Sequence, residues 1–342
     1  MPAARPALTS VAELVDAGLA NSADSPELDR VAKDFRIRIT PAMQSAEPGL
    51  ARQFVPDRRE LTVRPEELTD PIGDHAHSPV PGLTHRYTDR AILHVTQTCD
   101  VYCRFCFRRE AVGAAGPLPP DQLDNALAHI ASTPALREII LTGGDPLTLS
   151  PRRLADILDR LDAIPHIEVI RIHSRVPVVA PQRISAIAPL LTRRAAVFVV
   201  NHINHPDELT PEAKAAIRTL AKTGAALLSQ SVLLRGVNDD AETLARLFRG
   251  LTAIGVTPYY LHHCDLARGT SHFRTTIDEG LSIIAELRGH LSGIAIPSYV
   301  LDLPGGFGKV PLDSAAVTRA GPGLWHIRDW RGGLHEYRDI TR

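Results

Sequence analysis

The feature of this 342-residue chain that most constrains its fold is a regular alternation of short apolar runs and helical patterns, which begins at residue 91. After the first gap, successive apolar runs begin about thirty residues apart, which is the length of one βα unit. Such alternation predicts a parallel sheet, closed or open, flanked by helices. The predicted strands are 91–98, 137–144, 167–174, 195–202, 226–234 and 257–263, the predicted helices are 120–133, 151–163, 181–193, 211–223 and 239–254, and a helix at 275–292 and an apolar run at 298–306 follow.

Two flanking regions differ in pattern from this array. Residues 1–82 are predicted to form an N-terminal helical region that ends in a linker rich in turn formers. One of its helices is expected to begin at Ser25, a capping residue followed by proline. Residues 307–342 are predicted to hold a glycine turn with a lysine and then a hairpin that turns at Gly332-Gly333. Residues 83–306 between them form the predicted α/β barrel.

The cysteine count and the charge exclude several classes of protein. Four cysteines in a chain of this length are too few for a secreted disulfide scaffold. The N-terminal segment does not resemble a signal peptide, and no apolar stretch is long enough to span a membrane. A formal net charge of −1 gives no electrostatic footprint for nucleic acid. We therefore expect a cytoplasmic protein that binds neither a membrane nor nucleic acid, and whose clustered cysteines bind a metal or do chemistry.

Polar and glycine residues stand at the ends of five predicted strands. In a βα barrel, the carboxyl ends of the strands form the rim that carries the active site. Any one of these residues is equally well explained as an ordinary loop residue, but five strand ends in a row favour a site. The residues are Gly143-Gly144-Asp145, His173-Ser174-Arg175, Asn201-His202, Gln230 and His263-Cys264-Asp265.

Three of the four cysteines, Cys99, Cys103 and Cys106, lie in one loop after the first predicted strand with the spacing C-x3-C-x2-C. A structural zinc site needs four ligands, and no nearby histidine completes a pair. Three thiolates suit a cubane iron–sulfur cluster whose fourth iron stays open for another ligand. The alternative is a set of buried thiols, since free cysteine is common in protein cores. Cys264 is remote in sequence and is not expected to bind the cluster.

A glycine-rich turn at 302–309 ends in Lys309. A phosphate-binding loop would require a hydroxyl residue and a helix after the lysine, whereas Val310 and Pro311 follow it here. Lysine is a surface residue by default. It also forms Schiff bases with carbonyl compounds such as pyridoxal phosphate (PLP), and flexible glycines would let it move as substrate replaces it. The residues alone do not decide between a surface lysine and a PLP lysine.

The cysteine spacing, with Phe105 directly before the last cysteine, resembles the signature of radical S-adenosylmethionine (SAM) enzymes. The segment LTGGDP, one strand later, resembles the GGE-type motif of those enzymes, which contacts the amino group of SAM. The resemblance implies that Gly143, Gly144 and Asp145 bind SAM, that the open iron chelates it, and that its reduction yields a deoxyadenosyl radical. In such enzymes the cluster and SAM carry the chemistry, and the protein positions and shields them.

A longer resemblance, from about residue 70 to residue 312, is to the lysine 2,3-aminomutase family. It is carried by SPVPGLTHRYTDRAILHVTQTCDVYCRFCFRR, SVLLRGVND, PYYLHHCDLARGTSHFRT and DLPGGFGKVP. It implies a partial (β/α)6 radical SAM barrel that uses a [4Fe-4S] cluster, SAM and PLP. It also implies conversion of L-α-lysine to β-lysine by 2,3-amino migration, with a flavodoxin- or ferredoxin-type reductant.

The same resemblance implies roles for individual residues. PLP would form its Schiff base with Lys309, and Arg108 would bind the carboxylate of the substrate. Without the resemblance, Arg108 and Arg109 are also explained as solvated charges at a helix start, and an aspartate at a strand end as the cap of a turn. The other implied contacts are Arg86, Tyr87 and Arg90 around PLP, His202 and Gln230 near SAM and PLP, and Asp265 and Asp302 on the distal ammonium of the substrate.

The chain departs from the larger members of that family, which end in a cysteine-bearing zinc segment, because it has no cysteine after Cys264. The sequence therefore does not decide whether the protein has a zinc site. It also leaves the oligomeric state open, and a homo-oligomer is possible. The length and the tail resemble a sister group whose members make β-lysine for attachment to translation elongation factor P. Three alternatives remain: an aminomutase for another cation such as arginine, a different radical SAM enzyme, and a cluster-bearing binding protein without turnover.

Overall fold

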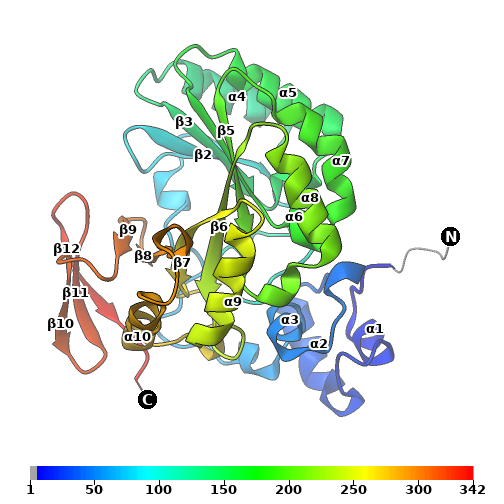
Figure 1. The fold of residues 1–342 in the computed structure, drawn as a ribbon, viewed down its shortest axis with the longest axis vertical. Coiled ribbons are helices and arrows are strands. Elements are labelled where there is room, and N and C mark those ends of the chain that lie inside the picture. The colour runs from blue at the N-terminus through cyan, green and yellow to red at the C-terminus, as the bar shows by residue number, and fades with distance from the viewer. Residues whose placement is uncertain (1–5, 342) are drawn as a thin grey trace.

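A single curled sheet of nine strands forms the centre of the computed structural model, which describes residues 6–341 (Figure 1). The strands lie in chain order from β1 to β9, with β2 to β8 parallel and the two edge strands antiparallel to their neighbours. The predicted partial barrel is confirmed, and β8 adds a seventh parallel strand. The bounds are β1 Leu83–Thr84, β2 Arg90–Thr96, β3 Glu138–Gly143, β4 Val169–Ser174, β5 Ala196–His202, β6 Ala226–Leu233, β7 Thr257–His263, β8 Ser298–Leu303 and β9 Gly308–Pro311.

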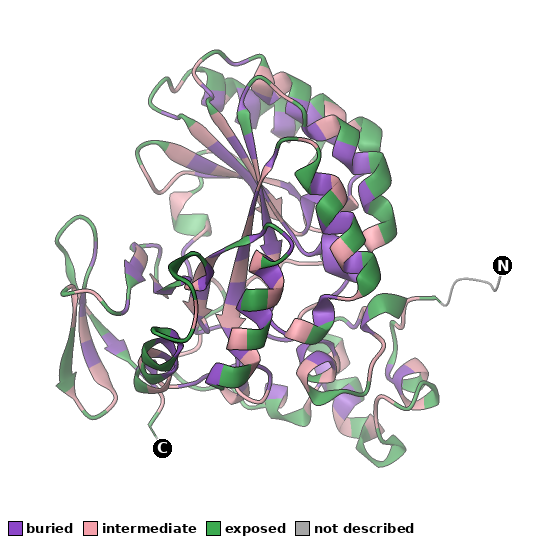
Figure 2. Cartoon of the chain, in the orientation of Figure 1, coloured by how far each residue is buried: buried purple, intermediate pink, exposed green. Residues whose placement is uncertain are grey.

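Amphipathic helices cover the outer face of the sheet, and buried residues fill the strands and the inner faces of the helices (Figure 2). In α5, for example, Leu154, Leu158 and Leu161 recur at helical spacing and are fully buried. Side chains of the residues before α5, α8, α9 and α10 cap their first turns. The bounds are α4 Pro120–Ala131, α5 Pro151–Asp162, α6 Val176–Val179, α7 Ile184–Ile187, α8 Pro211–Ala221, α9 Ala241–Thr252 and α10 Ile277–Leu287.

The continuous helix predicted at 181–193 is wrong. This segment instead consists of a short 3-10 turn, the one-turn helix α7, and a second 3-10 turn at Ala188–Leu191. Pro189 explains the break after α7, because proline in a helix interior lacks the backbone donor of a continuous helix and clashes with the preceding turn. Pro181 opens the segment, a position where proline is tolerated.

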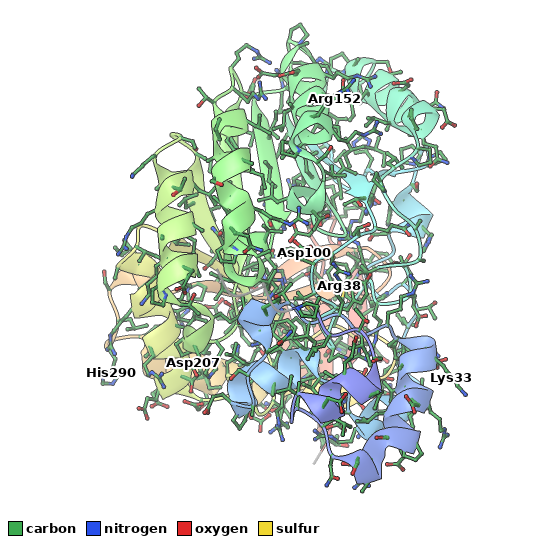
Figure 3. The ribbon with its side chains drawn as sticks, turned by 90° about the vertical axis from the view of Figure 1, so that its right-hand side faces the viewer. Lys33, Arg38, Asp100, Arg152, Asp207 and His290 are labelled. Carbon is green, nitrogen blue, oxygen red and sulfur yellow. The ribbon has the colours of Figure 1, made fainter. Side chains whose placement is uncertain are left out.

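The N-terminal region packs against the mouth of the barrel beside the cysteine loop. Its helices are α1 Val11–Asp16, α2 Ser25–Asp34 and α3 Pro48–Phe54. The main-chain N–H groups of Tyr102 and Arg104 donate to the carbonyls of Arg38 (3.0 Å) and Gln53 (2.8 Å). Figure 3 labels Arg38 and Asp100 at this junction, where the Arg38 guanidinium donates to the Asp100 carbonyl at 3.2 Å. The N-terminal region therefore supports the loop that carries the three cysteines.

The C-terminal segment forms a separate antiparallel sheet of three strands, β10 Val317–Gly321, β11 Leu324–Arg328 and β12 Leu334–Arg338. The predicted hairpin corresponds to β11 and β12, with Gly332 in the turn between them at a φ of 90°. Strand β10 was not predicted. The division of the chain at residues 82 and 306 remains a prediction. Among residues 6–341, no helix is long and apolar enough to cross a membrane.

Candidate active site

The three clustered cysteines follow β2 directly, at the carboxyl end of the barrel strands. All three are free thiols. Burial raises the pKa of Cys106 to about 11 and the pKa values of Cys99 and Cys103 above that of an ordinary thiol. These thiols are therefore protonated at neutral pH, and a metal that binds them must displace their protons.

The donor set fits a cluster better than a single ion. Among the residues that the structure describes, no group of three or more His, Cys, Asp or Glu side chains is placed to hold one metal ion. The three thiolates of a cubane need not converge on one point, because each thiolate binds its own iron atom. Three thiolates with no fourth ligand nearby also leave one iron open. Cys99, Cys103 and Cys106 would hold this cluster.

A buried ionic group fixes the backbone of the cysteine loop. Glu60, which is 1% exposed, accepts two hydrogen bonds from the Arg104 guanidinium at 3.0 and 2.7 Å and also pairs with Arg109. Arg109 further donates to the carbonyl of Arg268 at 3.1 Å. Arg109 is therefore a structural residue of the loop and not a solvated charge, whereas Arg108 points elsewhere.

The glycine segment after β3 lies directly against the start of the cysteine loop. Gly143 has a φ of 109°, and a Cβ there would lie 2.5 Å from the carbonyl oxygen of Thr96. A Cβ on Gly144 would collide with the carbonyl of Thr98. Only glycine allows this close approach of the two backbones. The segment therefore borders the cysteines, as a SAM-binding motif requires.

The Asp145 side chain is already satisfied within the protein. Its Oδ1 accepts from the Ser174 hydroxyl at 2.8 Å, and its Oδ2 accepts from the Arg175 main chain at 2.7 Å. Burial raises the pKa of Asp145 to about 6 despite these hydrogen bonds. A SAM contact by Asp145 remains a prediction, and in this arrangement its carboxylate orients the backbone after β4.

Lys309 lies on β9, directly opposite Asp302 of β8 in the sheet register. Its Nζ is 2.5 Å from Asp302 Oδ1, and the other oxygen of that carboxylate is 3.1 Å from His262 Nδ1. Although burial acts in the opposite sense, Lys309 and His262 hold the pKa of Asp302 far below its usual range. The short β8–β9 connection thus brings the candidate PLP lysine and a candidate substrate residue into contact.

Tyr87 contacts the main chain of this lysine and brings an arginine and a tryptophan near it. The Tyr87 hydroxyl accepts from the Lys309 main-chain N–H at 3.0 Å, and the Arg90 guanidinium lies 3.7 Å from the centre of the Tyr87 ring. Trp330, from the turn between β11 and β12, stacks on Tyr87 with ring centres 5.9 Å apart. The group fits PLP, because guanidinium groups bind phosphate bidentately and an aromatic ring can lie along a pyridine ring.

Asp265 lies just after the end of β7, partly buried, near the same pair. Desolvation and the neighbouring Asp302 carboxylate raise the pKa of Asp265 to about 8, and the charges of Lys309 and Arg108 act in the opposite sense. Two largely desolvated carboxylates near one lysine form a site for positive charge.

Arg108 and Arg86 meet at a residue that the sequence analysis missed, Asp74. Arg108 Nε lies 2.7 Å from Asp74 Oδ2, and Arg86 Nη2 lies 3.7 Å from Oδ1. Although burial would raise it, the charge and hydrogen bond of Arg108 lower the pKa of Asp74 to about 2. Asp74 thus connects the arginine predicted to bind the substrate carboxylate with one predicted to bind PLP. No signal in the turn-rich segment around it distinguished this aspartate.

We expect Asp74→Asn to lower the free energy of unfolding by roughly 3 kcal/mol, the lower end for removing one partner of a buried ion pair. Because folding lowers the pKa of Asp74, this carboxylate contributes to the free energy of unfolding above about pH 4. That contribution is lost as the pH falls toward 2. Urea denaturation at neutral pH measures the change. Asp159→Asn is the control, because its pair with Arg193 is largely exposed on the aspartate side. Equal effects of the two variants would contradict this assignment.

His202, the last residue of β5, is the register partner of Gln230 in β6. Gln230 lies inside β6, which continues to Leu233, and not at the strand end that the sequence predicted. The His202 ring lies 5.7 Å from that of Phe105 in the cysteine loop. Burial keeps the pKa of His202 well below its ordinary value, so the ring is neutral. Its Nε2 is buried without a hydrogen-bond partner among the described residues. Such an atom is costly unless a bound group satisfies it, which fits a cofactor beside the cysteine loop.

Comparison with known proteins first defines the class. Residues 93–248 match the family model described as "Radical SAM superfamily". A solved structure of Streptococcus suis SuiB bound to S-adenosylmethionine aligns with a TM-score of 0.48 and 12% identity, over 63% of this chain and 50% of that one. The match to this family model accounts for a [4Fe-4S] cluster and SAM as cofactors.

The particular family follows from the C-terminal part and from whole-chain relatives. Residues 284–341 match the model described as "Lysine-2,3-aminomutase". The chain is 42% identical to an L-lysine 2,3-aminomutase of Fusobacterium nucleatum over 91% of this chain and 75% of that protein. It is 37% identical to a glutamate 2,3-aminomutase of Clostridioides difficile over 83% of this chain and 68% of that protein. The chain belongs to the lysine 2,3-aminomutase family, which adds PLP to its cofactors, as the resemblance implied.

Proposed function

We propose that this protein is an L-lysine 2,3-aminomutase, which moves the amino group of L-α-lysine from carbon 2 to carbon 3. Its family includes a relative named for glutamate, so family membership alone leaves the substrate open. The observation that carries the proposal is the pair of largely desolvated carboxylates, Asp265 and Asp302, near Lys309. An acidic side chain would be repelled there, whereas the distal ammonium of lysine would be paired.

When bound, the cluster and SAM would supply the radical that starts the amino migration, and PLP would supply a conjugated system that stabilises it. Lys309 would anchor PLP, with Arg86, Tyr87 and Arg90 around it. Arg108 would bind the substrate carboxylate, and Asp265 would bind the distal ammonium. Contacts at both ends of the substrate would thus hold its reacting carbons in place.

The contact between Lys309 and Asp302 suggests how the site prepares for its substrate. Asp302 already pairs with one cation, the Lys309 ammonium, so its carboxylate is placed to accept another, such as the distal ammonium of the substrate. His262, which lies 3.1 Å from the other oxygen of Asp302, would keep this carboxylate oriented.

We expect Asp265→Asn and Asp302→Asn each to lower kcat/KM for lysine by about tenfold or more, because loss of one partner of a desolvated charge pair costs roughly 2–5 kcal/mol. Steady-state turnover by the reconstituted enzyme measures this. Asp278→Asn is the control, because Asp278 is 55% exposed and pairs with Arg319 on the surface. Parent-like kinetics of both site variants would overturn the specificity assignment while leaving the radical chemistry intact.

The raised pKa of Asp265 predicts a pH dependence of lysine binding. Below about pH 8 this carboxyl is protonated, and the substrate ammonium must displace the proton. Lysine should therefore bind more tightly as the pH rises toward 8, by at most about tenfold per pH unit, and the trend should level off above it. The KM for lysine, followed from about pH 6 to about pH 9, checks this. Asp265→Asn should remove the trend, and an unchanged slope in that variant would contradict the role of Asp265.

The remaining parts of the proposal concern partners. Reduction of the cluster would be supplied by a flavodoxin- or ferredoxin-type protein in a cytoplasmic setting, where free thiols stay reduced. The resemblance to the elongation factor P branch supports that factor as the destination of the β-lysine. Arginine stays a second candidate substrate, because a guanidinium also fits two carboxylates.

A further inference from the structure

Arg175, the first residue after β4, contacts one of the clustered cysteines and has no role in the substrate site of the proposed reaction. It is 5% exposed, and its Nη1 donates a hydrogen bond to Cys103 Sγ at 2.8 Å. Within residues 6–341, no other cysteine sulfur accepts a hydrogen bond from a charged side chain. One of the three candidate cluster thiolates therefore differs from the other two in having a buried cation as its direct partner.

The protein holds this guanidinium from several sides. Its Nη2 donates to Glu208 at 2.8 Å and also to Gln53, both fully buried. The main-chain N–H of Arg175 is fixed by Asp145 at 2.7 Å, and the guanidinium lies 4.6 Å from the centre of the Phe54 ring. Four groups from three separate parts of the chain thus orient one donor toward one sulfur, which is more than a simple ion pair needs.

We propose that Arg175 raises the reduction potential of the [4Fe-4S] cluster by donating a charge-assisted hydrogen bond to the Cys103 thiolate, and that Gln53 and Glu208 orient it for this purpose. Reduction adds one negative charge to the cluster, and a nearby buried cation stabilises the more negative state. Hydrogen bonds to cluster sulfurs are among the levers by which proteins set these potentials. The inference rests on the cofactors of the proposed function and concerns a residue beyond its substrate site.

Arg175 could alternatively serve only to attach the N-terminal region, through Gln53, to the barrel. That role predicts a loss of stability when Arg175 is replaced but no specific change in potential. Potentiometric titration of the reconstituted cluster, followed by electron paramagnetic resonance of its reduced form, separates the two roles. The variants are Arg175→Gln, Arg175→Lys and, as the matched control, Arg171→Gln, because Arg171 is a largely buried arginine of the same strand that pairs with Glu138.

At the midpoint potential of the parent, we expect Arg175→Gln to lower the ratio of reduced to oxidised cluster at least tenfold, which corresponds to about 59 mV for one electron. Arg175→Lys should lower it about threefold, since lysine keeps the charge but loses the planar fork. Arg171→Gln should change it less than twofold. Midpoints of both Arg175 variants equal to that of the parent would overturn the proposal, as would an equal shift in Arg171→Gln.

Iron and sulfide are determined before each titration. A parent protein that takes up no cluster would contradict the proposed function rather than this inference. If Arg175→Gln does not retain four irons, the titration of Arg175→Lys decides, and a midpoint equal to that of the parent overturns the role of Arg175.

Discussion

Replacement of Lys309 by alanine should abolish all PLP that borohydride can fix to the protein, together with aminomutase activity. The chain contains four lysines, Lys33, Lys214, Lys222 and Lys309, of which Lys309 lies beside Asp302 and Tyr87. Lys33 and Lys222 are exposed, and Lys214 lies on the outer helix α8. Lys309 is therefore the lysine that the fold presents to the group of arginine and aromatic residues suited to PLP.

Lys309→Arg makes this test sharper than alanine alone. Arginine retains a positive charge for the buried Asp302 carboxylate, so the ion pair and the fold are kept, but it cannot form a Schiff base. Both variants should lose the reducible absorbance of PLP while iron content stays at the parent level, and Lys222→Ala should behave like the parent. Mass spectrometry of the reduced, digested protein locates the adduct. An adduct on Lys33, Lys214 or Lys222 would remove the main support for the proposed PLP site.

Replacement of Cys99, Cys103 or Cys106 by serine should eliminate the cluster and all SAM cleavage, whereas Cys264→Ser should retain about four irons and four sulfides per chain. Cys264 is 1% exposed and packs with Leu234, Val237 and Phe273 in a small apolar cluster. Burial raises its pKa to about 12, and its Sγ lies 3.9 Å from the carbonyl oxygen of Asp265. It is thus an inert core thiol in these surroundings.

Iron and sulfide analysis after anaerobic reconstitution distinguishes the two groups of variants. Cys264→Ser is the matched control, because it removes a thiol that lies outside the loop after β2 and changes little the apolar cluster that Cys264 shares with Phe105 of that loop. Cluster loss in Cys264→Ser alone, or a full cluster in Cys103→Ser, would refute the three-thiolate assignment.

The fold was largely predictable because each βα unit carries its own local signals. Apolar β-branched runs marked β2 to β7, and proline or capping residues marked the starts of helices such as α5 and α8. The prediction failed at 181–193, where helical periodicity in the apolar residues concealed Pro189, which breaks the backbone pattern of a helix. It also missed β10, whose residues are mostly exposed and so carry little alternation.

The candidate site was predictable only where a motif or a resemblance marked it. The spacing of Cys99, Cys103 and Cys106 is local, and the sequence contains it completely. Asp74 and Arg175 act through partners 34 and 72 residues away in the chain, and no local pattern encodes such pairs. Asp265 and Asp302 were identified through resemblance. The Asp302 charge raises the pKa of Asp265 only because β7 pairs with β8 and brings the two residues close.

The measurement that tests the central claim most directly is the turnover of lysine, arginine, ornithine and glutamate by the protein reconstituted with iron, sulfide, SAM, PLP and a strong reductant. Products are separated by chromatography and identified by the position of the amino group. We predict that lysine is the best substrate and that β-lysine is its product, because Asp265 and Asp302 pair with a distal cation. Preferential turnover of glutamate, or no amino migration on any of the four by a protein with a full cluster and bound PLP, would contradict the account.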